Sequence, residues 1–81
     1  MEYVKTGDDG AARRELERLL AGNPGYVGSY YHLGKLLERT GDAARAREVY
    51  ADGIKAATAA GDAHAARELR TAIDLLEDTS D

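Results

Sequence analysis

Two apolar stripes at helical spacing, separated by a three-residue break at Thr40-Gly41-Asp42, dominate the middle of the sequence. Their members are Tyr30, Leu33, Gly34 and Leu37 before the break, and Ala46, Val49, Tyr50, Gly53 and Ile54 after it. Apolar residues at i, i+3, i+4 and i+7 give a helix one buried face. Gly41 suits the left-handed position after a helix, and Asp42 can cap the next one. The stretch therefore predicts two antiparallel helices, and small residues at Gly34 and Ala46 would let them approach closely.

Length and composition favour a small all-α domain. A chain of 81 residues buries only about 60 to 65% of its extended surface, so every helix must contribute to the core. Alanine, arginine, glutamate and leucine are abundant, and only one proline is present. This composition favours helix over strand.

Charge and residue usage exclude several classes of protein. The net charge of −4, with Lys and Arg interspersed among Asp and Glu, argues against a nucleic-acid binder. Cysteine is absent, which excludes disulfides, cysteine-ligated metals and thiol nucleophiles. No apolar run approaches the roughly 20 residues of a membrane span, and the first residues do not begin a secretion signal. We therefore expect a cytoplasmic protein without nucleic-acid or membrane partners.

Breaks divide the rest of the chain into helices. Gly7-Asp8 resembles the break at Gly41-Asp42 and predicts a turn there, while Pro24 ends the following helix because proline cannot continue one. A further Gly-Asp pair at 61–62 precedes a last amphipathic stretch, which we interpret as a capping helix with a charged outer face. The predicted helical segments are 1–5, 9–21, 26–39, 43–60 and 63–77.

A period of 34 residues relates the first part of the chain to the middle. The shift maps Tyr3 to Leu37, Gly7 to Gly41, Asp8 to Asp42, Ala12 to Ala46, Leu16 to Tyr50 and Leu20 to Ile54. The second unit contains Tyr30, Leu33-Gly34, Leu37, Gly41-Asp42, Ala46 and Tyr50, and the first supplies Gly7-Asp8, Ala12, Leu16 and Pro24. This period and these residues resemble the tetratricopeptide repeat, a helical hairpin with an aromatic, Leu-Gly, Tyr, Ala, Phe and Pro at fixed spacing.

The resemblance implies an α-α superhelix made of repeated hairpins. It divides the chain into a partial repeat at 1–26, a complete repeat at 27–60, a capping helix at 61–78 and a frayed tail at 79–81. Residues matching Leu33-Gly34 would fall at or before the first residue, which suggests a fragment or a degenerate remnant. Thr58 replaces the expected proline, so the second helix of the complete repeat should be unusually long.

No catalytic constellation is evident in the sequence. His64 and Glu68 are spaced i, i+4 and could share a metal ion, but two ligands do not make a site, so we interpret them as a surface ion pair. The aspartates at 8–9, 42 and 62 each begin a predicted helix, where a carboxylate caps free N–H groups. Ser29 and Ser80 lack the surroundings of a nucleophile. We predict no enzymatic activity, no cofactor and no metal; a small metal-dependent hydrolase is the disfavoured alternative.

One surface of the predicted helix 26–39 stands out. The residues opposite its buried stripe are Gly28, Tyr31, His32, Lys35, Glu38 and Arg39. The resemblance places them in the concave groove where proteins with these repeats hold segments of their partners. Tyr31 offers apolar area with a polar tip, and Lys35 can meet a carboxylate. On the residues alone, a solvated face with one amphipathic tyrosine is the alternative interpretation.

By resemblance, the predicted function is protein–protein interaction, as a scaffold or adaptor module that binds a peptide or a partner domain without chemistry. Self-association is the alternative. Stacked repeats usually need about three units for a continuous core. We therefore expect Leu16, Leu19 and Leu20 to be thinly covered, unless a second copy in a homo-oligomer or an upstream helix packs on them.

Overall fold

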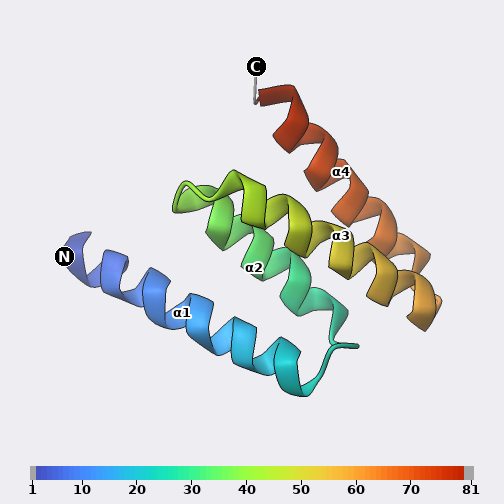
Figure 1. The fold of residues 1–81 in the computed structure, drawn as a ribbon, viewed down its shortest axis with the longest axis horizontal. Coiled ribbons are helices and arrows are strands. Elements are labelled where there is room, and N and C mark those ends of the chain that lie inside the picture. The colour runs from blue at the N-terminus through green and yellow to red at the C-terminus, as the bar shows by residue number, and fades with distance from the viewer. Residues whose placement is uncertain (1, 80–81) are drawn as a thin grey trace.

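Four helices joined by short turns make up residues 2–79, the part of the chain that the computed structural model describes, with side chains from residue 9 to residue 78 (Figure 1). They are α1 (Glu2–Gly22), α2 (Val27–Arg39), α3 (Ala43–Ala60) and α4 (Ala63–Thr79). The helix α2 packs against both α1 and α3, and α4 packs on α3. The predicted all-α array of antiparallel hairpins is confirmed.

The turns at Gly41 and Gly61 form as predicted. Gly41 has a φ of 91° and Gly61 a φ of 74°, so both adopt the left-handed conformation that glycine tolerates. After α2, the N–H groups of residues 41 and 42 donate to the carbonyls of Glu38 and Leu37 at 3.1 and 2.8 Å. This pair of bonds closes the helix end. Asp42 and Asp62 then accept the backbone N–H groups of residues 45 and 65 at 3.3 and 3.1 Å, and so cap α3 and α4.

The predicted break at Gly7-Asp8 is wrong. The helix α1 is continuous from Glu2 to Gly22, so the predicted segments 1–5 and 9–21 are one helix. A separate segment of about five residues would gain almost no hydrogen bonds after a costly nucleation. A glycine inside a helix costs only about 0.5 to 1 kcal/mol. Continuing the helix is therefore favoured over turning.

At the C-terminal end α4 extends through Thr79. The frayed tail at 79–81 stays a prediction. Residue 1 and residues 80–81, which belong to the first predicted segment and to that tail, lie outside the described residues.

Reciprocal packing of tyrosines on glycines joins α2 to α3. A Cβ added to Gly34 would lie 2.1 Å from Cε1 of Tyr50, whose side chain is fully buried. A Cβ added to Gly53 would lie 2.6 Å from Cβ of Tyr30. The predicted close approach of the two helices at Gly34 and Ala46 differs in one respect: the neighbour of Gly34 is the Tyr50 ring. Leu33, Leu37, Ala46 and Val49 complete the interior of the pair.

The two outer helices attach to this pair differently. Leu16 and Leu20 of α1 pack against the core, whereas Leu19 is 43% exposed and Ala12 is also exposed, so only part of the apolar side of α1 is buried. Asp9 lies inside α1 and caps no helix, contrary to prediction. Its Oδ1 accepts a hydrogen bond from Arg39 of α2 at 2.8 Å. The helix α4 buries Leu69 and Ala72 and packs Ile73 and Leu76 on the core.

Substitution at two helical glycines should separate packing from backbone effects. Gly34→Ala places a methyl group in the space of the Tyr50 ring, and we expect the free energy of unfolding to fall by about 1 to 3 kcal/mol. Gly10→Ala is the matched control, because nothing lies within 4 Å of its Cβ position. It should raise stability by about 0.5 to 1 kcal/mol. Urea unfolding measures both, and a tolerated Gly34→Ala would contradict the helix pairing.

Candidate functional site

Tyr31 occupies the space between α2 and α4 and lines two hollows there. The first, a notch of about 150 Å³, is lined by Val27, Gly28, Tyr31, Asp62, Ala65, Glu68 and Leu69. The second is wider, about 420 Å³, and is lined by Tyr31, His64, Arg67, Glu68 and Thr71. We call the two hollows together the α2–α4 groove. Gly28 helps to keep the notch open, since no atom lies within 4 Å of the position that its Cβ would take.

A cluster of four side chains connects the groove to the core. The ammonium nitrogen of Lys35 lies 5.8 Å from the ring centroid of Tyr31 and 4.0 Å from Oε2 of Glu38. The same carboxylate oxygen accepts a hydrogen bond from the Tyr50 hydroxyl at 2.5 Å, and the rings of Tyr50 and Tyr31 lie 6.3 Å apart. The contacts with Tyr50 and Glu38 therefore hold Tyr31 and Lys35 in place. The Glu38 carboxylate already interacts with groups of the protein itself.

Burial is the main cause that raises the pKa of the Tyr50 phenol far above its ordinary value. The hydrogen bond to Glu38 and the negative charge of that carboxylate raise the pKa further, because both oppose a second negative charge. The phenol therefore remains a donor across the physiological pH range. Glu38 is held as its acceptor.

The remaining predicted residues of α2 divide between the groove and α1. His32 is exposed, and its ring stands edge-on to Tyr31 with the centroids 6.4 Å apart. Arg39 instead reaches α1, where its hydrogen bond to Asp9 raises the pKa of the guanidinium. The structure therefore brings Gly28, Tyr31, His32, Lys35 and Glu38 to one side of α2, whereas Arg39 links α2 to α1.

Sequence reasoning missed the second wall of the groove, which α4 supplies. Its residues are Asp62, His64, Arg67, Glu68 and Thr71. The i, i+4, i+7 spacing of His64, Glu68 and Thr71 indicates one face of a helix, but not what that face adjoins. His64 and Glu68 lie side by side as predicted, with Nε2 and Oε2 3.1 Å apart.

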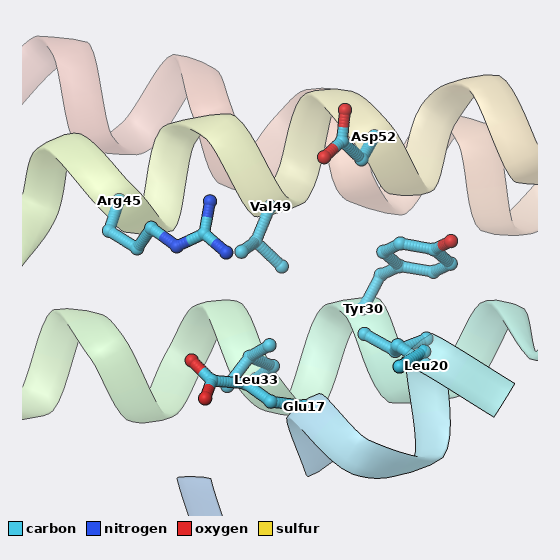
Figure 2. A pocket seen from close by; sticks show the side chains of 8 residues that line it. Glu17, Leu20, Tyr30, Leu33, Arg45, Val49 and Asp52 are labelled. Atoms are coloured by element: carbon cyan, nitrogen blue, oxygen red, sulfur yellow. The ribbon is translucent and has the colours of Figure 1, made fainter. Parts of the chain in front are cut away.

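A second cleft, of about 410 Å³, lies between α1, α2 and α3 (Figure 2). Tyr30 and Leu33 line it, and by helical spacing they point away from the groove side of α2. Its floor is already core, since Tyr30, Leu33 and Val49 are 9%, 2% and 4% exposed. The Tyr30 hydroxyl donates to the Pro24 carbonyl at 2.6 Å. The groove is the better candidate, because the half-buried aromatic ring of Tyr31 lines both of its hollows.

The described residues hold neither a cluster of metal ligands nor a membrane-spanning helix. No three His, Cys, Asp or Glu side chains between residues 9 and 78 gather as metal ligands would. None of the helices within residues 2–79 has the length and apolar character needed to cross a bilayer.

Comparison with known proteins decides the family. No family model matches the sequence. A TPR repeat-containing protein of Pseudomonas aeruginosa is 31% identical over 75 residues, which are 93% of this chain and 71% of the relative. The chain belongs to the tetratricopeptide repeat (TPR) family. TPR domains are generally protein-interaction modules, and TPR proteins are typically non-catalytic scaffolds.

Solved structures agree with this assignment. The solution NMR structure of a TPR domain protein from Salinibacter ruber has a TM-score of 0.87 to this chain at 37% identity, covering 96% of this chain and 79% of that one. A crystal structure of a TPR domain protein from the same organism has a TM-score of 0.84 at 37% identity, covering 96% and 87%. In this TPR chain, two of the motif residues, Gly34 and Tyr50, pack directly against each other.

The raised pKa of Tyr50 predicts an alkaline loss of stability. Above about pH 10 the unfolded chain releases the phenolic proton while the folded chain retains it. Unfolding then releases a proton, so its free energy should fall by up to about 1.4 kcal/mol per pH unit for this group. Urea unfolding at about pH 8 and about pH 11 measures the change. Tyr50→Phe lacks the titrating group and should lose less stability over that interval; an equal loss in both proteins would contradict the assignment.

Proposed function

We propose that this TPR chain is a scaffold or adaptor module that binds a segment of another protein in the α2–α4 groove and performs no chemistry. The observation that carries the proposal is the position of Tyr31, a half-buried aromatic residue that lines both hollows of the groove. Aromatic residues in partly enclosed positions contribute strongly to protein interfaces, because they bury large apolar area and keep a polar tip.

The groove has an apolar base and a polar rim. The buried Leu69 and the half-buried Val27 and Ala65 form an apolar base, while Lys35 and His32 stand exposed beside Tyr31. An apolar centre with a polar rim is the usual composition of a protein interface. In this proposal Gly28, Tyr31, His32 and Lys35 contact the partner directly. Glu38 contributes by positioning Lys35, and Arg39 lies at the C-terminal end of α2.

A double substitution in the groove tests the proposal. Tyr31→Ala combined with Lys35→Ala should abolish affinity capture of the partner from an extract of the producing cells, because it removes the central aromatic surface and the cation above it. Light scattering should show an unchanged oligomeric state. Arg47→Ala, which removes one cation from the exposed surface of α3, should capture the same partner as the unaltered chain. Equal capture by the double variant would contradict the proposal.

Self-association through α1 is a second candidate, favoured by the exposure of Leu19. This side chain is 43% exposed and borders a hollow of about 290 Å³ whose other lining residues are Glu15, Arg18, Gly22 and Asn23. Leu16 and Leu20 are packed on the core, so Leu19 alone of the three predicted leucines points away from it. A second copy of the chain would bury this side chain.

Charge at Leu19 tests the second candidate. Leu19→Lys should lower the mean mass measured by light scattering at high protein concentration, because two copies would each place a cation in the shared contact. Leu75→Lys is the control, since Leu75 is 57% exposed on α4. A mass equal to that of a single chain at every concentration would exclude self-association.

A further inference from the structure

We infer that the notch of the α2–α4 groove receives a lysine or arginine side chain, so that the bound segment is basic at this point. This inference rests on the proposed function and adds the chemistry of the partner. The side chains that form the notch are Val27, Tyr31, Ala65 and Leu69, which are mostly apolar, and Asp62 and Glu68, which are acidic. The size of the notch, its apolar wall and its two carboxylates each limit what can enter.

The volume suits one side chain. At about 150 Å³ the notch is smaller than the roughly 300 to 1,000 Å³ of sites that enclose drug-sized ligands. Its wall includes the half-buried side chains of Val27, Tyr31 and Ala65. Lysine and arginine carry three or four methylenes that can pack on such a surface while the charged end remains at the rim.

Both charged residues of the notch are carboxylates with an oxygen to spare. Asp62 uses Oδ1 to accept the N–H of Ala65 at 3.1 Å, and Glu68 meets His64 through Oε2. A carboxylate has two oxygens, so each group can also accept a hydrogen bond from a bound cation. The net charge of −4 further favours the approach of a basic segment.

Other side chains fit the notch less well. An acidic side chain would meet two like charges, and an apolar one would remove water from the carboxylates without replacing its hydrogen bonds. The nearby cations do not change this conclusion. Lys35 is engaged with Tyr31 and Glu38, and Arg67 lines the wider hollow but not the notch.

Matched peptides test the inference. The probes are four acetylated and amidated peptides of sequence Ala-Ala-X-Ala-Ala, in which X is arginine, lysine, norleucine or glutamate. Each is titrated into the nitrogen-15-labelled chain, and the amide resonances of Gly28, Glu68 and Leu69 are followed. The arginine and lysine peptides should shift these resonances in a saturable way, with dissociation constants at least about tenfold below those of the other two.

Three variants locate the effect. Glu68→Gln removes one notch charge and should weaken the arginine peptide about tenfold. Gly28→Leu fills the notch and should abolish its binding, while an unchanged melting temperature confirms folding, since the Cβ position is unobstructed. Glu48→Gln is the charge-matched control, because Glu48 is exposed on α3, where it pairs with Arg45. It should bind like the unaltered chain.

The possible failures are distinguishable. Equal binding of the norleucine peptide, or preference for the glutamate peptide, would overturn the inferred charge while leaving the groove as the binding site. Equal weakening by Glu48→Gln and Glu68→Gln would show that only net charge matters, which also overturns the inference. If no peptide shifts the groove resonances, the notch takes no basic side chain. The capture experiment with the Tyr31 and Lys35 variant then decides separately whether the groove binds a partner.

Discussion

The packing of two tyrosines against two glycines holds α2 to α3, and the other helices are placed by that pair. Tyr50 of α3 fills the space beside Gly34 of α2, while Tyr30 of α2 lies against Gly53 of α3. A fully buried large side chain contributes about 1.5 to 3 kcal/mol, which matters greatly in a chain this short. Gly53 also admits α4, since Cδ1 of Leu69 lies 3.0 Å from its Cβ position. One helix crossing therefore fixes where both neighbouring helices can dock.

The crossing of α2 and α3 also positions the side chains of the groove. The Tyr50 ring is part of the core, but its hydroxyl passes through to Glu38, and Glu38 in turn lies beside Lys35. Tyr31 rests against the Tyr50 ring on one side and lines the groove on the other. A side chain of α3 thus supports the exposed face of α2. In the proposed function, stability and recognition are coupled at this point, because a change that displaces Tyr50 also displaces the groove residues above it.

Local chemistry was enough to predict three helices but not the extent of the first. Gly41 and Gly61 end their helices because Leu37 and Ala57, which accept the closing hydrogen bonds, are fully buried and fix the direction of the returning chain. Gly7 is followed by the same aspartate, yet the helix continues through both residues. The groove wall on α4 could not be predicted from the sequence either, because it depends on how α4 lies relative to α2.

The notch shows how one residue can serve folding and recognition together. Asp62 begins α4 by capping its first turn, and that turn lies beside the start of α2, so the capping carboxylate also stands at the notch rim. Loss of a cap typically costs about 1 kcal/mol, which limits substitution of Asp62. Glu68 and Gly28 do not cap a helix. The Glu68 side chain is largely exposed, and Gly28 faces open space. Partner specificity can therefore change at these two positions while the helix start, and with it the groove, is preserved.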